Sequence, residues 1–356
     1  MKSHVFFVPL SNNEAPEIIE KKLKRLLTAS GFDARVPEKG LTAVKTHFGE
    51  KNSVTHIPPR FFRPLSARIR QAGGRPFFTE TSTLYKGSRS DAPSHLMHAE
   101  NHGFTAAETG MPVIMADGVK GEWETEVEIA SSPGKTVMVA GLLARIHAIV
   151  CVAHPTGHGG MGFGGAIKNL GMGLSSRRGK RVMHSSVKPF VNAEKCTRCG
   201  HCLLWCPEDA IILGDKAAEI DAAKCIGCGE CLVECRFDAI KYDWGMEGAQ
   251  LQEGVAEHAL GAVKGKALFC ISVLVNFTRD CDCFGTAKTR LIDDFGLLAS
   301  PDPVAIDEAA MDLIEKREGK PLSDIAYPGI DPRIQTRHGE KIGLGSREYG
   351  LTTLEA

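Results

Sequence analysis

CTRCGHCLLWCP at residues 196–207 and CIGCGECLVEC at residues 225–235 contain eight of the twelve cysteines of the chain. Each motif has the spacing C-x2-C-x2-C-x3-C. Aligning residues 196–211 with residues 225–240 gives nine identities in sixteen positions, including the trailing Asp-Ala-Ile. The segment is therefore an internal repeat, and its cysteines decide how it folds.

The spacing of the cysteines has a physical cause. Three thiolates separated by two residues each allow a tight loop to present three sulfurs to three corners of an iron–sulfur cubane. The fourth cysteine begins a helix, points away from that loop and reaches the partner cluster. The predicted ligands are Cys196, Cys199, Cys202 and Cys235 for one [4Fe–4S] cluster, and Cys225, Cys228, Cys231 and Cys206 for the other.

With this spacing, Asn192–Asp243 resembles a bacterial-type two-cluster ferredoxin domain. The resemblance implies an electron-transfer role for the segment. The alternative is structural zinc, which takes four ligands around one ion and is commonly held by two C-x2-C pairs. The doubled motif does not have that pattern, so we predict two clusters rather than zinc.

Short apolar runs alternate with helical patterns on both sides of this segment. The predicted strands are His4–Leu10, Leu41–His47, Arg75–Thr79, Val113–Ala116, Ile146–Ala153 and Ala267–Val275. The predicted helices are Ala15–Ser30, Phe61–Ala72 and Pro303–Glu315. Strands that alternate with helices indicate an α/β fold with a mixed or mainly parallel sheet.

Because the α/β pattern resumes after the cysteines, we predict one α/β domain interrupted by a small ferredoxin-like α+β domain. The predicted boundaries are 1–188 and 245–345 for the discontinuous domain, and 189–244 for the insertion. Residues 346–356 are predicted to form a loosely packed tail.

The overall composition is typical of a globular protein, with 43% apolar and 24% charged residues. Lysine plus arginine equals aspartate plus glutamate, 43 against 43, so a nucleic-acid partner is not expected. The apolar run Val5–Leu10 is too short for a signal peptide, and Thr136–Ala153 contains Arg145 and His147, which argues against a membrane span. We expect a cytoplasmic protein with reduced thiols.

A glycine-rich run, HPTGHGGMGFGGAIKNLGMGLSSRRGKRVMHSS at residues 154–186, carries the first candidate ligand site and contains His154, His158, Lys168, Asn169, Lys180 and His184. Glycines let a backbone approach a ligand closely, and a helix that starts after them favours anions. The run fits neither a P-loop nor a dinucleotide fingerprint. The alternative is a tight packing loop with surface histidines. We predict catalytic roles for His158, Lys168 and His184, and cofactor binding by Gly164, Gly165 and Asn169.

Two predicted strands are followed by polar clusters, a common position for functional groups in α/β sheets. The first cluster is Lys45, His47 and Glu50, at and just beyond the end of one strand, and we predict catalytic roles for these residues. The second is Glu80, Thr81, Tyr85 and Arg89 after the next strand, of which Glu80, Thr81 and Arg89 are predicted to bind a cofactor. We predict that they bind an anionic ligand, with a solvated charged loop as the alternative. Cys281 and Cys283, in the run Asp-Cys-Asp-Cys, form a further metal or cluster site, a redox pair or two ordinary thiols.

Outside the two four-cysteine motifs, several runs resemble the family of iron–sulfur proteins called domain of unknown function 362 (DUF362). They are VKTHFGE (44–50), FFTETSTLYKGSR (77–89), HGGMGFGGAIKNLGMG (158–173), NFTRDCDC (276–283) and LLASPDPVAID (297–307). The family has no general assigned chemistry, so this resemblance implies membership without a reaction.

The order His158, Lys168, His184, with glycines before the lysine, is similar to the active-site run of nickel-pincer lactate racemases. That resemblance implies Lys168 as the anchor of the pincer nucleotide, His184 as a nickel ligand and His158 as an acid/base. The surrounding residues differ, so we expect shared architecture here rather than the pincer cofactor.

Three functions are compatible with this sequence. The first is a redox enzyme, an oxidoreductase in which two clusters pass electrons to or from a ligand site in the α/β domain. The second is an elaborated ferredoxin carrier that docks redox protein partners. The third is a redox-sensing or assembly protein whose clusters are structural.

Overall fold

The run Ala148–Ala153 forms strand β7, which is buried along its whole length, as expected of a central strand with both faces covered. Its side chains alternate between two apolar cores. Ile149 and Cys151 belong to one core, and Val150 and Val152 belong to the other. The fold therefore has a sheet with an apolar layer on each face.

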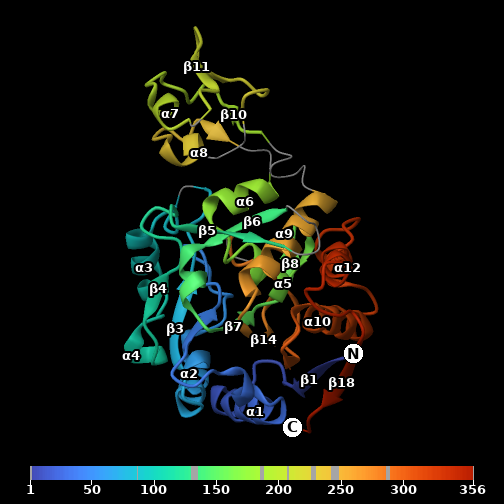
Figure 1. Ribbon diagram of the computed structural model, residues 1–356. Helices are drawn as coiled ribbons and strands as arrows, with labels where there is room; N and C mark the ends of the chain where they lie inside the picture. Colours follow the sequence, from blue (N-terminus) through green and yellow to red (C-terminus); the bar gives the residue numbers. More distant parts are fainter. Residues whose placement is uncertain are drawn as a thin grey trace.

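The computed structural model describes residues 2–85, 87–129, 135–184, 188–206, 208–225, 230–241, 248–285 and 289–355. The main sheet has eight strands in the order β18-β1-β17-β14-β7-β2-β3-β4 (Figure 1). Its strands are β1 (Ser3–Pro9), β2 (Leu41–Lys45), β3 (Arg75–Glu80), β4 (Val113–Met115), β7 (Ala148–Ala153), β14 (Ala267–Leu274), β17 (Gly296–Ser300) and β18 (Tyr349–Thr353).

The sheet is mainly parallel. Strand β17 is antiparallel to both of its neighbours, β1 and β14, and the remaining neighbours pair in parallel. The predicted fold class, α/β with a mixed or mainly parallel sheet, is confirmed. Parallel strands β2, β3, β7 and β14 end at the same edge, which is where ligands bind in open α/β sheets.

Helices cover both faces of the sheet. Helices α1, α2 and α3 contribute to one core, and α5, α9 and α10 contribute to the other. The helices outside the cysteine-rich segment are α1 (Pro16–Ala29), α2 (Phe62–Gln71), α3 (Ala92–Asn101), α4 (Ala106–Thr109), α5 (Ala166–Gly171), α6 (Arg177–Met183), α9 (Ala249–Val263), α10 (Pro303–Glu318), α11 (Leu322–Ala326) and α12 (Ile334–Lys341). The short 3-10 helices are η1 (Phe32–Arg35), η2 (Pro59–Phe61) and η3 (Gly141–Arg145).

Local sequence sets both ends of α10. The side chain of Asp302 accepts hydrogen bonds from the backbone N–H groups of Val304 and Ala305, and Pro303 stands at the first helical position. The helix stops at Gly319, whose φ of 71° is readily adopted by glycine.

The predicted loose tail is wrong. Residues 349–353 form β18, which pairs in parallel with β1 from Ser3↔Tyr349 to Phe7↔Thr353. Tyrosine and threonine favour extended backbone, and without β18 the outer edge of β1 would carry unpaired N–H and C=O groups. The Tyr349 hydroxyl also donates to Asp312 at 2.6 Å.

Three two-stranded sheets surround the main one. They are β5 (Glu124–Glu128) with β6 (Thr136–Ala140), β8 (Thr156–His158) with β9 (Gly162–Gly164), and β15 (Phe277–Thr278) with β16 (Arg290–Ile292). Among the described residues, every helix is too short or too polar to cross a membrane.

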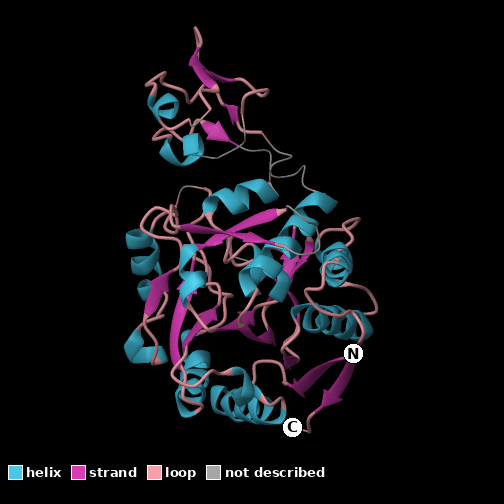
Figure 2. Cartoon of the chain, in the orientation of Figure 1, coloured by secondary structure: helices cyan, strands magenta, loops and turns pink. Residues whose placement is uncertain are grey.

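The cysteine-rich segment forms a small lobe that stands above the main sheet (Figures 1 and 2). It contains β10 (Phe190–Val191) with β13 (Ile240–Lys241), β11 (Ile211–Leu213) with β12 (Ala218–Ile220), and the short helices α7 (His201–Leu204) and α8 (Glu230–Glu234). Strands from before and after this lobe share the main sheet.

Candidate functional site

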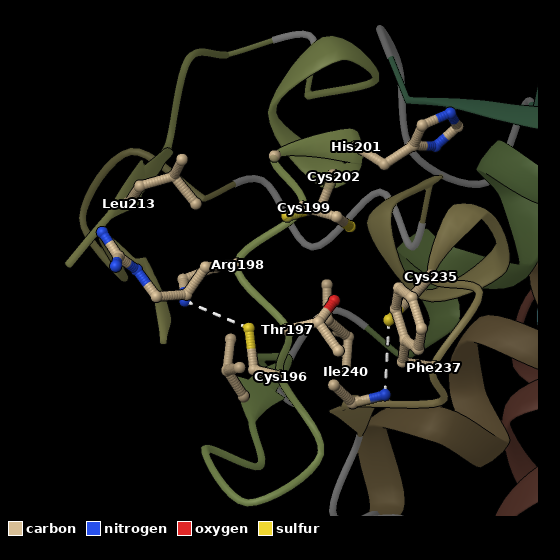
Figure 3. A pocket seen from close by; sticks show the side chains of 14 residues that line it. Cys196, Thr197, Arg198, Cys199, His201, Cys202, Leu213, Cys235, Phe237 and Ile240 are labelled. Atoms are coloured by element: carbon tan, nitrogen blue, oxygen red, sulfur yellow. Dashed lines mark hydrogen bonds between the residues drawn. The ribbon is translucent and has the colours of Figure 1, made fainter. Parts of the chain in front are cut away.

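Four cysteines from both halves of the repeat line one pocket of the cysteine-rich lobe (Figure 3). They are Cys196, Cys199, Cys202 and Cys235. The first three lie in the loop before α7 and in its first turn, and Cys235 lies just after α8. These are the four residues that the cysteine spacing predicts for the first cluster. A prediction that assigned each motif to a cluster of its own would have left Cys235 out.

Backbone donors reach several of the predicted cluster sulfurs. Ala210 N–H donates to Cys206 Sγ at 3.2 Å, and Ala239 N–H donates to Cys235 Sγ at 3.3 Å. Ala210 and Ala239 are equivalent positions of the repeat, four residues after the fourth cysteine of each motif. N–H donors stabilise thiolate charge and tune iron–sulfur centres, so this all-sulfur donor set fits a cubane.

The second predicted set is described in part. Cys206, Cys225 and Cys231 lie within the described residues, and Cys228 lies outside them. In the whole part of the chain that the structure describes, no group of three or more His, Cys, Asp or Glu side chains is arranged to hold a single metal ion.

A second candidate site lies at the carboxyl edge of the main sheet. Lys45, the last residue of β2, is buried and pairs with Glu80, the last residue of β3. The Lys45 ammonium also donates to Asn169 Oδ1 at 2.8 Å. Asn169 Nδ2 donates to the carbonyls of Lys45 (3.2 Å) and Val152 (3.1 Å), and thereby joins α5 to two strand ends.

One glycine of the glycine-rich run, Gly164, lies directly against the side chain of Lys168. A Cβ at Gly164 would lie 3.1 Å from Lys168 Cδ, so this glycine makes room for the lysine side chain. His158 Nδ1 accepts from Gly160 N–H at 3.1 Å. Burial, followed by the charges of Lys168 and His184, lowers the pKa of His158 well below its ordinary value. His158, Lys168 and His184 are therefore in one electrostatic neighbourhood.

Lys168 itself has a depressed pKa. Burial, followed by the nearby Lys45 ammonium and opposed by Asp282, lowers the pKa of Lys168 to about 8. At pH 8 its neutral fraction is about a hundredfold larger than that of an ordinary lysine with a pKa of about 10.4. The unfolded chain binds more protons than the native one between these values, so this lysine makes stability rise with pH across that window.

We expect acetic anhydride at pH 8 to acetylate Lys168 faster than it would acetylate an equally buried lysine of ordinary pKa. The rate of acetylation should level off above pH 8. Peptide mass spectrometry against time and pH measures this. Lys180 is the matched control, because burial also lowers its pKa to about 8 but its ammonium is buried and donates to Thr81 Oγ1 at 2.6 Å. A Lys168 rate that keeps rising about tenfold per pH unit beyond pH 8 would contradict the shift.

A hydrogen-bonded cluster follows β2 and β3. Arg89 Nε donates to Glu50 Oε2 at 3.0 Å, and Ser88 donates to Glu50 Oε1 at 3.0 Å. Burial raises the pKa of Glu50, but the Arg89 guanidinium and the hydrogen bonds outweigh burial and lower it. The hydroxyl of Tyr85 contacts both Arg89 and Glu50. Glu50 is therefore a fixed anion that orients Arg89.

Two buried histidines complete this region. Burial, then Arg89, lowers the pKa of both His47 and His95 well below the ordinary value, so both are neutral at pH 7. Among the described residues, His47 Nε2 and both ring nitrogens of His95 are buried without a hydrogen-bond partner. Buried polar atoms without partners are rare in proteins, and a ligand would satisfy them. His95 was not predicted, because nothing local to α3 distinguishes it.

The predicted role of Gly165 requires correction. The first N–H groups of α5 do not face an open site, because Asp307 accepts from Ala166 at 2.7 Å and from Ile167 at 2.9 Å. A Cβ at Gly165 would lie 2.3 Å from Asp307 Oδ1. Gly165 therefore allows α5 to pack against α10, and the anion at this helix start is a side chain of the protein itself.

Thr81 has a protein partner on each side. Its hydroxyl donates to the Gly173 carbonyl at 3.1 Å and accepts from Lys180. Asp117, fully buried, accepts from Ser82 N–H at 2.7 Å, and burial raises its pKa. Lys180 belongs to the glycine-rich run but was given no role, and Asp117 was not predicted, since its segment has no recognisable motif.

Cys281 and Cys283, which come shortly after β15 in the connection that leaves β14, form a disulfide. Of the predicted alternatives this arrangement matches the redox pair, and sulfurs in a disulfide are not thiolate ligands for a metal. Asp282, between them, is buried and lies 2.7 Å from His154 Nδ1. The disulfide departs from the expectation that all thiols are reduced.

Tyr85 connects the two sites. Its ring packs against the apolar core of the cysteine-rich lobe, which includes Cys202, Cys231 and Cys235. Its hydroxyl contacts Glu50 and Arg89 at the strand ends and the carbonyl of Cys283 at 3.4 Å. Lys120 also lies over the ring of Trp205 in the lobe, 5.4 Å from its centre.

Comparison with known proteins places most of the chain in one family. Residues 42–312 match the family model described as "Domain of unknown function (DUF362)". A curated relative, pyruvate synthase subunit PorD from Methanothermobacter marburgensis, is 41% identical over 58 residues. That match covers 16% of this chain and 64% of the relative, so the chain spans less than two thirds of it.

Two solved structures are similar. One is the lactate racemase apoprotein from Thermoanaerobacterium thermosaccharolyticum, with 12% identity and a TM-score of 0.42 over 76% of this chain and 50% of the other. The second is a structural-genomics protein from Thermotoga maritima, with 11% identity and a TM-score of 0.42 over 87% of this chain and 60% of the other.

Proposed function

This chain belongs to the DUF362 family, and we propose that it is an iron–sulfur redox protein whose cysteine-rich lobe exchanges electrons with a ligand held at the strand ends. The lobe would correspond to an inserted two-cluster ferredoxin-like domain at residues 189–244, within the discontinuous α/β domain of residues 1–188 and 245–345. Cys196, Cys199, Cys202 and Cys235 would hold one [4Fe–4S] cluster, and Cys225, Cys228, Cys231 and Cys206 the other. When bound, the clusters would supply one-electron transfer.

The contacts of Tyr85 carry this proposal. One side chain packs on the cysteine-rich core and also touches the Glu50–Arg89 pair at the sheet edge. Its burial, largest among several causes, raises its pKa to about 12, so the hydroxyl stays protonated and keeps donating. A structural unit with its own separate role would not need to be joined to the polar site in this way.

The polar residues of the strand-end site favour a small anion. Four charged groups act electrostatically on Lys168: the cations Lys45 and Arg89, and the carboxylates of Asp282 and Glu80. Lys168 and the neutral histidines His47 and His158 can donate to or accept a proton from a ligand. Asn169 and Thr81 hold the surrounding backbone, so we assign them to positioning.

The test uses full-length protein purified and reduced without oxygen. A panel of small carboxylates and inorganic phosphate is added, and reoxidation is followed by the absorbance of the iron–sulfur centres. We expect at least one anion to accelerate reoxidation, and Lys168→Ala to abolish that effect while the iron content stays unchanged. Lys24→Ala, at an exposed lysine of α1, is the control. If no anion changes the rate in the wild-type protein, the proposal fails.

A second candidate is an electron carrier that docks a protein partner. Six large apolar side chains are exposed on the cysteine-rich lobe, and a partner protein could bury them. They are Phe190 (50%), Leu204 (80%), Trp205 (42%), Ile212 (61%), Leu213 (43%) and Phe237 (45%). If a redox protein but no small anion accelerates reoxidation, and Leu204→Ser with Ile212→Ser slows it, the carrier function is the correct one.

A further inference from the structure

The Cys281–Cys283 pair lies where four parallel strands end. It belongs to the connection that leaves β14, and that connection contacts the segments that follow the other three strands. After β2, the carbonyl of Lys51 lies 2.2 Å from where a Cβ at Gly285 would stand. After β3, Tyr85 donates to the Cys283 carbonyl, and after β7, His154 contacts Asp282. The pair therefore occupies the edge where α/β sheets carry out their chemistry.

The two sulfurs differ in accessibility. Cys281 is buried, with 6% of its surface exposed. Cys283 is only half-buried, and the next residue, Phe284, is 52% exposed. Since thiol–disulfide exchange begins with attack on one sulfur and depends on access to it, Cys283 is the sulfur that a small thiolate can reach.

The two aspartates beside the pair, Asp280 and Asp282, have hydrogen-bond partners in other segments. Free carboxylates beside a disulfide would repel an incoming thiolate. Asp282 instead faces His154 at 2.7 Å and Thr55 at 3.3 Å, and the carboxylate of Asp280 accepts from the hydroxyl of Tyr327. Lys168 also acts on Asp282 electrostatically. The positive charge of Lys168 therefore offsets part of the repulsion between Asp282 and an incoming thiolate.

We propose that Cys281 and Cys283 form a redox-active pair that undergoes thiol–disulfide exchange with a small-molecule thiol. This activity goes beyond the proposed function and does not depend on the iron–sulfur centres. A thiolate attacks Cys283 Sγ, the bond between the two protein sulfurs breaks, and Cys281 leaves as a thiolate that takes up a proton. A second thiolate attacks the mixed disulfide and releases Cys283, which is protonated in turn. Two small thiols are oxidised to one disulfide, and the protein pair gains two electrons and two protons.

The test equilibrates the full-length protein, without oxygen, in glutathione buffers of graded ratio, followed by quenching with iodoacetamide. Mass spectrometry then counts the labels on the peptide that contains both cysteines. We expect no label in oxidising buffer and two labels in reducing buffer, with a reversible transition between them. In Cys281→Ser, glutathione should be trapped on Cys283, and in Cys283→Ser the trapping should be largely lost. The peptide with Cys270, a buried cysteine of β14, serves as the control, since its labelling should not follow the buffer.

Three results would overturn the proposal: two labels in every buffer, glutathione trapped on Cys281 in place of Cys283, or a metal ion bound by wild-type protein that competes with labelling of both cysteines. The first and the third are measured on the wild-type protein, so they do not depend on how the variants fold. Iron content, measured in parallel, reports on the cysteine-rich lobe, so loss of the iron–sulfur centres is distinguished from failure of this pair.

Discussion

Cys235→Ser is expected to lower the iron content of the chain from about eight atoms to about four, with an equal loss of sulfide. Cys235 comes from the second motif but lines the pocket of the first three cysteines, so its loss should empty that pocket. Iron and sulfide analysis of oxygen-free protein measures the change. Cys270→Ala, which removes a thiol from the core of the main sheet, should keep the wild-type iron content.

Double variants reveal which cysteines act together, because residues of one unit are not additive. Cys202→Ser with Cys235→Ser should lose no more iron than either single variant, since both belong to one pocket. Cys202→Ser with Cys206→Ser should lose nearly all of it. The opposite pattern would show that each motif serves a single cluster, and a colourless wild-type protein with zinc as its metal would refute the clusters altogether.

The strands and helices with strong local patterns could be predicted from the sequence. The apolar run at β7 and the helical period at α1 each give an element within a few residues of the observed bounds. Helix α9 (Ala249–Val263) was missed, because its nine buried residues include the polar Gln252, Glu257 and His258, which obscure the apolar period in the sequence. At Gly261 a Cβ would lie 2.3 Å from Val137, so this glycine allows close packing that only the fold reveals.

The candidate site could be predicted only in part, because only some of its residues stand at positions that a local sequence pattern identifies. Lys45 and Glu80 stand at strand ends, where a sequence pattern suggests functional groups. Asn169, a hydrogen-bond partner of Lys45, is 124 residues away from it, and the parallel register of β2 and β7 brings α5 beside the ends of both strands. Asp307, which occupies the start of α5, is 140 residues from Ile167. Spacing can indicate a glycine-rich approach to a helix, but it cannot tell that a distant carboxylate fills it.

Lys45→Met is expected to destabilise the protein by about 3–5 kcal/mol, because it leaves the buried carboxylate of Glu80 without its cation. Denaturant unfolding of the wild type and variant measures the difference. Lys24→Met is the matched control on α1, since the Lys24 and Glu20 side chains are 61% and 47% exposed and such pairs contribute about 0–1 kcal/mol. Adding Glu80→Gln to Lys45→Met should recover part of the loss by removing the unpaired charge.

The pH dependence separates loss of charge compensation from loss of packing. In Lys45→Met the buried side chain of Glu80 has no counter-ion, and burial without a partner penalises a charged carboxylate far more than a neutral acid. Stability of the variant then falls as pH rises, and its deficit should be smaller near pH 5 than near pH 8. The double variant has no titrating carboxylate at this position and should lack that difference. An equal deficit at both pH values would mean that Lys45 stabilises the sheet edge through its packing and its bond to Asn169, and not as the counter-ion of Glu80.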